Sequence, residues 1–331
     1  MIGLSIIICA HNPRPHYLRR VLQALREQTL PIEEWELLLV DNASNEPLEN
    51  WADLTWHPHG RHIREMPLGI AFARIRGIRE AGAELLVFVD DDNVLDRDYL
   101  AHAKVIAAEH PELGAWSGNI QLEFEQPPPE WTRPYWPMLT AREVLQDAQA
   151  CSVSHNRATT PVGAGMCFRR KVGLFYYEQW LKSPVRKVLG ARGQSCTLGE
   201  DTDLALTACE MGMETGLFAR LKLTHLIPPQ RLTEDYLLRL CRGVAMSSLL
   251  MGLDRGTPPG GRLPHGLRWW TKFVYDCARK WGRKRRFYVA QAFGKRDALR
   301  TFIAVKTANQ ARRHIPQREG VPRELHPSLD R

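Results

Sequence analysis

Three short apolar runs, separated by segments with a helical pattern, constrain the fold of this chain most strongly. They occupy residues 4–10, 35–40 and 84–89, with the sequences LSIIICA, WELLLV and ELLVFV. The segments 16–28 and 69–82 between them place apolar side chains at helical spacing. Runs this apolar are typical of strands buried on both faces, so the alternation predicts an α/β fold with a mainly parallel sheet flanked by helices. Residues 61–65 are expected to add one short strand.

Carboxylates follow two of these predicted strands. Asp41 ends the second run, and Asp90, Asp91 and Asp92 end the third. Ligands of open α/β sheets bind outside the carboxyl ends of the strands, so these acids are expected along one binding rim. Asp41 has a simpler alternative role, because the sequence DNAS is also good turn chemistry.

The three consecutive aspartates need a positive partner if they are buried. A divalent metal is the natural candidate, since Mg²⁺ and Mn²⁺ prefer carboxylate and phosphate oxygens. On an extended backbone Asp90 and Asp92 would point the same way and Asp91 the opposite way. Two alternatives stay open, a solvated acidic turn and the Asp-x-Asp motif of a phosphatase of the haloacid dehalogenase type. A calcium loop fits less well, because Leu95 and Ala101 stand where such a loop needs Gly and Glu.

The second half of the chain is less regular. Residues 126–137 form a Pro-rich loop whose aromatic residues Trp131, Tyr135 and Trp136 are expected either to stack on sugar rings or to plug the core. Residues 160–173 suggest a strand with tight glycine turns. Helices are predicted over 198–212 and 232–250, the second capped by Thr233. A linker at 256–266 then leads into a mostly helical tail.

The charge distribution and the cysteine content limit the binding partners and the cellular compartment that we expect. Residues 262–331 contain 18 Lys and Arg against 5 Asp and Glu, a net charge of +13, and the preceding 261 residues carry −5. Such an asymmetry suggests an anionic partner for the tail. The seven cysteines form no C-x-x-C pair, so a zinc site or disulfide framework is not expected, and a reducing cytoplasm fits. The first apolar run lacks the flanking residues of a secretory signal. The sequence contains no run of 18 apolar residues, so no transmembrane helix is expected.

Seven motifs in order give a resemblance to a known family. They are LSIIICAHNPRPHYLRRVLQAL, LLVDNAS, PLGIAFARIRGI, LLVFVDDDNVLDRDYL, VGAGMCFRRKV, GEDTDLALTACEMG and THLIPPQRLTEDYLLRL. Together they resemble the family 2 glycosyltransferases with the GT-A fold, over about residues 3 to 245. The resemblance implies a nucleoside diphosphate sugar donor, Mn²⁺ or Mg²⁺, and inversion at the sugar carbon. It divides the chain into a catalytic domain at 1–255 and a basic, aromatic-rich helical extension at 256–331.

The resemblance also implies roles for particular residues. The donor-binding positions are expected to be Ala10, His11, Asn12, Asp41, Arg74, Asp90 and Asp91. Asp92 matches the direct metal ligand, and His225 lies where some GT-A enzymes place a further metal or diphosphate contact. Asp201 matches the catalytic base, with Glu200 beside it to orient the site or bind the acceptor.

Ordinary structural roles are alternatives to several of these assignments. Acids in the first turn of a helix, such as Glu200 and Asp201, stabilise it by about 0.3–1 kcal/mol each through the helix dipole. His11 and His225 would otherwise be ordinary hydrogen-bonded histidines, and Arg74 a solvated helix residue. Ile75 and Gly165 depart from the asparagines that the family often has at these places, which leaves the donor sugar open.

The basic tail has three candidate roles. Trp269, Trp270, Trp281 and the run Arg283–Arg286 suggest docking to an anionic membrane surface, with a glycan or lipid-linked acceptor at the inner face of the cell membrane. A helical appendage packed on the catalytic domain is the structural alternative, and nucleic-acid binding is not expected because the body is acidic. The other function classes considered are a magnesium-dependent phosphatase and a non-catalytic binding module.

Overall fold

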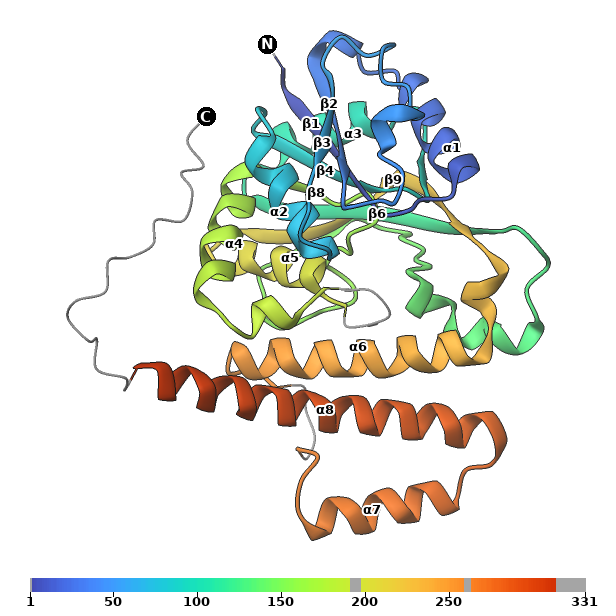
Figure 1. Cartoon of the computed structure of the whole chain (residues 1–331), viewed down its shortest axis with the longest axis vertical. Helices are drawn as coiled ribbons and strands as arrows, with labels where there is room; N and C mark the ends of the chain where they lie inside the picture. Colours follow the sequence, from blue (N-terminus) through green and yellow to red (C-terminus); the bar gives the residue numbers. More distant parts are fainter. Residues whose placement is uncertain (1, 191–197, 259–262, 314–331) are drawn as a thin grey trace.

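A computed structural model describes residues 2–190, 198–258 and 263–313 of the chain. Within these residues nine strands form a single sheet, in the order β3-β2-β1-β4-β8-β6-β9-β5, with β7 paired to β9. Figure 1 shows this sheet with helices on both sides and two long helices beneath it. Residues 191–197, 259–262 of the expected linker and 314–331 of the tail lie outside the described residues.

The predicted parallel strands are confirmed. β1 (Leu4–Ala10) lies between β2 (Trp35–Asp41) and β4 (Leu85–Asp90), and β3 (Gly60–Arg64) extends the sheet beyond β2, all in parallel register. Alternate residues of β1 enter two different cores, Ile6 and Ile8 on one face and Ile7 and Cys9 on the other. Burial on both faces is the physical reason why these strands are apolar without alternation.

Helices cover the two faces of the sheet. α1 (Pro15–Arg26) and α3 (Tyr99–Glu109) contribute to the first core, while α2 (Ile70–Glu80), α4 (Arg170–Lys182) and α5 (Glu200–Glu210) contribute to the second. Gly77 of α2 lies so close to β1 that a Cβ atom there would approach Ile7 Cγ2 to 2.3 Å. That contact lets α2 hold Arg74 directly beneath the strand ends.

The second half of the sheet is mixed. β8 (Cys167–Arg169) runs antiparallel to β4 and β6, β6 (Leu113–Phe124) pairs parallel with β9 (Glu214–Ile227), and β5 (Asn93–Leu95) and β7 (Ala148–Ala150) pair antiparallel with β9. The expected strand over 160–173 is wrong in extent, because only Cys167–Arg169 is strand and α4 begins at Arg170. The strand is short because Val172 and Tyr176 are spaced to bury a helical face in the second core.

Short 3-10 helices connect several elements. They span Ile32–Glu34, Leu48–Asn50, Glu130–Leu139, Arg186–Val188 and Pro229–Leu232. The aromatic segment at 130–139 packs into a third core, where Tyr135 stacks on Phe287 with ring centroids 3.8 Å apart and Trp136 contacts Phe124. The plug interpretation of this loop is therefore the one that the structure supports.

The C-terminal region consists of α6 (Glu234–Asp254), α7 (Leu267–Ala278) and α8 (Gly282–Arg313). Thr233 accepts a hydrogen bond from the Tyr236 backbone, which confirms the predicted N-cap of α6. α8 packs along α6, with Ala298 and Phe302 against Leu249 and Leu250, and α7 is the element farthest from the sheet (Figure 1). Among the described residues only α6 is long and apolar enough to cross a membrane, and half of its apolar window is buried within the protein.

Candidate active site at the strand ends

The strand ends hold the sequence-predicted acids, and three of them form ion pairs with different arginines. Asp41 pairs with Arg64, Asp90 with Arg74, and Asp92 with Arg231, at N···O distances of 2.6, 2.9 and 2.9 Å. The positive partners that the acidic run requires are therefore arginines of the chain itself. We call the group of Asp41, Arg74, Asp90, Asp92, Glu200, Asp201, His225 and Arg231 the strand-end site.

Asp41 organises the loop after β2. Its carboxylate accepts hydrogen bonds from the Ser44 and Leu48 backbone amides at 2.9 and 3.2 Å. Burial alone would raise the pKa of Asp41, but these hydrogen bonds and the charge of Arg64 lower it below its usual value. The turn role expected as an alternative for Asp41 is present, and both of its oxygens already have partners.

The loops after β1 and β2 are hydrogen-bonded to each other. His11 Nδ1 lies 2.8 Å from the Asn42 carbonyl, and Asn12 receives Asn45 N–H on its side chain while donating its own N–H to Ser44. Asn12 has a φ of 48°, a left-handed conformation that asparagine tolerates well. Ala10, the last residue of β1, is buried, whereas His11 and Asn12 are exposed above it.

Arg74 joins the two halves of the strand-end site. Its guanidinium donates to Asp90 at the end of β4 and, at 2.7 Å, to Glu200 at the start of α5, and it lies over the Phe88 ring. Arg74 and Glu200 are both buried, so the solvated role expected as an alternative for Arg74 is wrong. Burial raises the pKa of Glu200 to about 7 even though Arg74 acts to lower it. The ion pair connects residues 126 positions apart and brings α5 to the strand ends.

Asp201 lies beside this pair. Its Oδ2 accepts a hydrogen bond from the Gly163 backbone at 2.6 Å, and its Oδ1 accepts one from Thr202 N–H. A Cβ atom at Gly163 would lie 2.6 Å from Arg74 Nη2 and 2.9 Å from Asp201 Oδ2. A side chain at position 163 would therefore displace the Arg74 guanidinium or the Asp201 carboxylate, and no property of the isolated sequence distinguishes this glycine from the others.

A buried ion-pair network fixes α5 from its other side. Asp203 pairs with Arg255 at 2.6 Å and with Arg186 at 3.6 Å, and Glu210 pairs with both arginines. Asp203 is therefore structural, and it connects the first turn of α5 to the end of α6.

The acidic run has a different backbone from the one expected. β4 ends at Asp90 and β5 begins at Asn93, so Asp91 and Asp92 form a turn and the predicted alternation of an extended strand is wrong. Burial raises the pKa of Asp91, and the neighbouring Asp92 and Asp90 add to the effect. Burial also opposes the charged form of Asp92, but Arg231 and His225 outweigh it and hold the pKa of Asp92 below its usual range.

His225 lies within β9 and is directly paired with Asn93 of β5. Its Nε2 is 3.5 Å from Asp92 Oδ2, while its Nδ1 is 3.0 Å from the Leu139 carbonyl. A histidine that donates one ring N–H to a carbonyl presents the other nitrogen as a metal ligand. Arg231, which sequence analysis missed, contacts both Asp92 and His225 Nε2.

The side chains of Asp92 and His225 could supply two of the ligands of a divalent metal. No cluster of three His, Cys, Asp or Glu side chains within residues 2–190, 198–258 and 263–313 is placed to hold an ion. Mg²⁺ and Mn²⁺ are commonly bound by one or two protein ligands plus substrate phosphates, so Asp92 and His225 would suffice only together with a diphosphate. Arg231 would have to release Asp92 for this to happen.

Comparisons with known proteins agree with this fold. Residues 5–158 match the family model described as glycosyl transferase family 2. A curated relative, the putative glycosyltransferase EpsH of Bacillus subtilis (strain 168), is 26% identical over 125 residues, which cover 37% of this chain and 35% of the relative. The chain thus matches about a third of the length of that relative.

Two solved structures share the fold. The mannosyltransferase PcManGT from Pyrobaculum calidifontis, in complex with GDP-Man and Mn²⁺, has a TM-score of 0.51 at 18% identity, covering 93% of this chain and 75% of that one. TarS 1–349 of S. aureus, in complex with UDP, has a TM-score of 0.52 at 12% identity, covering 94% and 92%. The fold class is therefore GT-A, a mixed and mostly parallel sheet flanked by helices. Residues 5–158 of the chain are thus similar to glycosyl transferase family 2.

Proposed function

We propose that this chain transfers a sugar from a nucleoside diphosphate sugar to an acceptor hydroxyl, with inversion at the anomeric carbon. The observation that carries the proposal is the Arg74 bridge, which joins Asp90 of the strand ends to Glu200 and so sets Asp201 beside the donor-binding rim. The family match favours this reaction over the phosphatase and the non-catalytic module.

The donor would lie across the strand ends, with its base near Ala10, His11, Asn12 and Asp41. The neighbours' bound GDP-Man and UDP support a nucleotide of this class. Asp92 and His225 would hold Mn²⁺ or Mg²⁺, which when bound supplies positive charge to the leaving diphosphate. Arg231, released from Asp92, is placed to contact the same diphosphate.

Asp201 would act as the general base. It would take the proton from the acceptor hydroxyl as that oxygen attacks the sugar carbon on the face opposite the diphosphate. The Gly163 and Thr202 amides hold its carboxylate in place, and a single displacement of this kind inverts the anomeric centre. Glu200 keeps Arg74 charged and oriented without touching the reacting atoms.

Thermal shift and turnover assays would test the proposal. UDP-, GDP- and dTDP-sugars, each with and without Mn²⁺, should give one donor class that raises the melting temperature only with metal and is turned over to nucleoside diphosphate. Release of phosphate from simple monoesters, with no response to any nucleotide sugar, would contradict the proposal and revive the phosphatase.

We also propose that the outer face of α7 docks on an anionic membrane surface, where the acceptor would be a glycan or lipid-linked hydroxyl in cell-surface polysaccharide synthesis. Leu267, Val274, Tyr275 and Trp281 are 80%, 61%, 58% and 82% exposed. Arg268, Lys272 and Arg279 lie among them on the same helix or directly after it, a composition typical of interfacial helices. In this proposal the chain would lie on the cytoplasmic face of the cell membrane.

Part of the basic cluster expected to meet the membrane has another role. Arg283 and Arg286 pair with Glu234 of α6, and Phe287 is buried against Tyr135. Docking is therefore assigned to α7, while the start of α8 holds the helices together.

Vesicle flotation would test the docking surface. The full chain should float with vesicles containing phosphatidylserine and not with phosphatidylcholine vesicles, and the double variant Trp281→Ser, Val274→Ser should float less. Arg283→Gln, which changes the paired cluster, should have a smaller effect. Equal flotation of the wild type and the double variant would overturn the assignment.

A further inference from the structure

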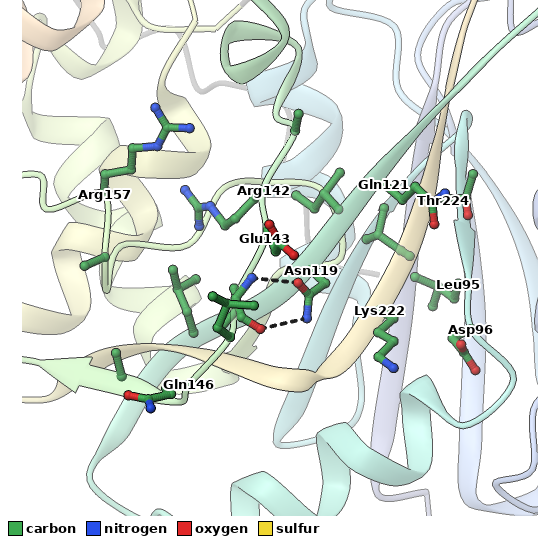
Figure 2. Close-up of a pocket in the computed structure, with 18 of the residues that line it drawn as sticks. Leu95, Asp96, Asn119, Gln121, Arg142, Glu143, Gln146, Arg157, Lys222 and Thr224 are labelled. Carbon is green, nitrogen blue, oxygen red and sulfur yellow. Dashed lines mark hydrogen bonds between the residues drawn. The ribbon is translucent and has the colours of Figure 1, made fainter.

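A separate pocket of about 1100 Å³ opens along β5, β6 and β9. Arg142 and Arg157 project into it from the segment after the aromatic loop, and Figure 2 shows their guanidinium groups on the same side of the pocket. We call it the arginine pocket. None of the strand-end site residues lines it.

Arg142 is held firmly in place. Its backbone exchanges two hydrogen bonds with Ile120 of β6, at 2.9 and 3.1 Å. Its guanidinium donates to the Thr160 carbonyl at 3.0 Å. The side chain thus leaves a fixed backbone in a defined direction, as expected of a binding residue.

The pocket is connected to the proposed base through a short loop. Thr160 receives the hydrogen bond from Arg142, and Gly163, three residues later, donates to Asp201. Three residues span at most about 10 Å, so Arg142 lies within reach of a short saccharide whose hydroxyl is on Asp201. Burial and the charge of Arg157 together lower the pKa of Arg142 to about 10, although Asp201 opposes both.

Arg142 and Arg157 have no carboxylate partner within the part of the chain that the structure describes. The arginines that contact the acids of the strand ends and of α5 are paired, for example Arg64 with Asp41 and Arg255 with Asp203. Glu143 also lines the pocket but forms no ion pair with either arginine. Two neighbouring guanidinium groups without an anion are a ready-made site for one, since guanidinium binds carboxylate and phosphate through two parallel hydrogen bonds.

We propose that Arg142 and Arg157 bind an anionic group of the acceptor, the carboxylate of a uronic acid or a phosphate on the saccharide. This inference rests on the proposed glycosyl transfer and names the acceptor class for it. A neutral acceptor would leave the guanidinium pair uncompensated in a partly buried pocket, whereas an anionic one would be bound and oriented with its hydroxyl toward Asp201.

Binding of three small probes tests the proposal without a donor. Methyl β-glucuronide, glucose 6-phosphate and methyl β-glucoside would be titrated against the full chain by NMR at low salt. At least one of the two anionic probes should bind on the order of tenfold more tightly than the neutral glucoside, and which of them does so identifies the anion. Arg142→Gln should remove that preference, and Arg157→Gln should reduce it.

Arg26→Gln, which changes an exposed arginine of α1, is the matched control, and it should leave the preference intact. Arg157 is exposed, so its variant has little reason to misfold, and it keeps the test open if Arg142→Gln folds poorly. Equal binding of all three probes, or an anion preference that survives both arginine variants, would overturn the subsite.

The outcome is separable from that of the proposed function. Melting temperatures with UDP or GDP and Mn²⁺ report on the strand-end site alone. A chain that binds no nucleotide but still prefers the anionic probes would contradict the transfer reaction and keep the anion site. A chain that turns over donor without any acceptor charge preference would contradict only the anion site.

Discussion

The strand-end site and the arginine pocket differ in whether their charged side chains form ion pairs. At the strand ends Asp41, Asp90 and Asp92 each form an ion pair with a different arginine. In the arginine pocket two guanidinium groups stand together, and no carboxylate of the described chain pairs with them. The two regions meet at Asp201, which is hydrogen-bonded to the loop between them.

The difference indicates what each region is prepared to bind. A buried ion pair is costly to break on one side only, because the remaining charge is left without compensation. The strand ends are therefore organised before ligand arrives, and a cation–diphosphate ligand would have to exchange with Arg231. The arginine pocket has its charge exposed and needs an anion from outside.

The largest effect is expected where the two regions meet. Asp201→Asn should lower transfer by about 10²–10⁴-fold, because the acceptor proton loses its base, while nucleotide binding stays within about twofold. Initial rates and thermal shift with nucleotide would measure the two quantities. Asp235→Asn, which changes an exposed acid of α6, is the control. Near-normal turnover of Asp201→Asn would remove Asp201 from the mechanism.

Arg74→Gln should break the paired region itself. It leaves Glu200 and Asp90 without their cation, so the free energy of unfolding should fall by about 3–5 kcal/mol in urea titrations. Adding Glu200→Gln should recover part of the loss. Arg76→Gln, on the same helix and half-exposed, should cost less than about 1 kcal/mol. Equal costs for Arg74→Gln and Arg76→Gln would show that the bridge contributes little.

Asp92→Asn tests whether a metal acts at the strand-end site. Removing one of two protein ligands should weaken Mn²⁺-dependent nucleotide binding by about 10–100-fold, as measured by calorimetry at several metal concentrations. Arg231→Gln should instead strengthen Mn²⁺-dependent nucleotide binding, since it frees Asp92 from its competing cation. If both variants keep the Mn²⁺ dependence of the wild type, metal does not act at this position.

Glu200 should give the smallest and most gradual effect, as a dependence on pH. Because the pKa of Glu200 is raised from 4.5 to about 7, the folded state binds its proton more tightly than the unfolded state. Its contribution to stability is thus fully present below pH 4.5 and is lost as pH rises through about 7. Relative to Glu200→Gln, the wild type should lose about 1–3 kcal/mol of unfolding free energy between pH 5 and 8.

Activity should change in the other direction over the same range. Deprotonated Glu200 holds Arg74 in an ion pair, so the transfer rate should rise between pH 6 and 8 with an inflection near 7. In Glu200→Gln this inflection should be absent. An unchanged inflection in the variant would assign it to another group.

The first half of the fold was predictable from sequence because its signals are local. The runs at 4–10, 35–40 and 84–89 and the helical spacing between them depend only on which residues are buried. The observed ends of β1, α1, β2, α2 and β4 all lie within two residues of their expected positions. The half of the sheet with mixed strand directions was harder to predict from the sequence. β8 has three residues and is followed directly by α4, so no window of sequence is long enough to define its period.

The site was predictable as a set of acids but not as a set of pairs. Asp41, Asp90 and Asp92 were identified from their positions after strands, and Asp201 from its motif. Their partners Arg64 and Arg231 were missed, because pairing depends on tertiary contacts that the sequence does not display. Arg142 and Arg157 were missed for the same reason, since an arginine without a partner is visible only when its surroundings are known.

A crystal structure with nucleoside diphosphate and Mn²⁺ tests the central claim most directly. We expect an anomalous manganese signal within ligand distance of Asp92 and His225, diphosphate oxygens beside it, and Asp201 facing the position of the missing sugar. Nucleotide bound in the arginine pocket, with no manganese at Asp92, would contradict the assignment of the two regions.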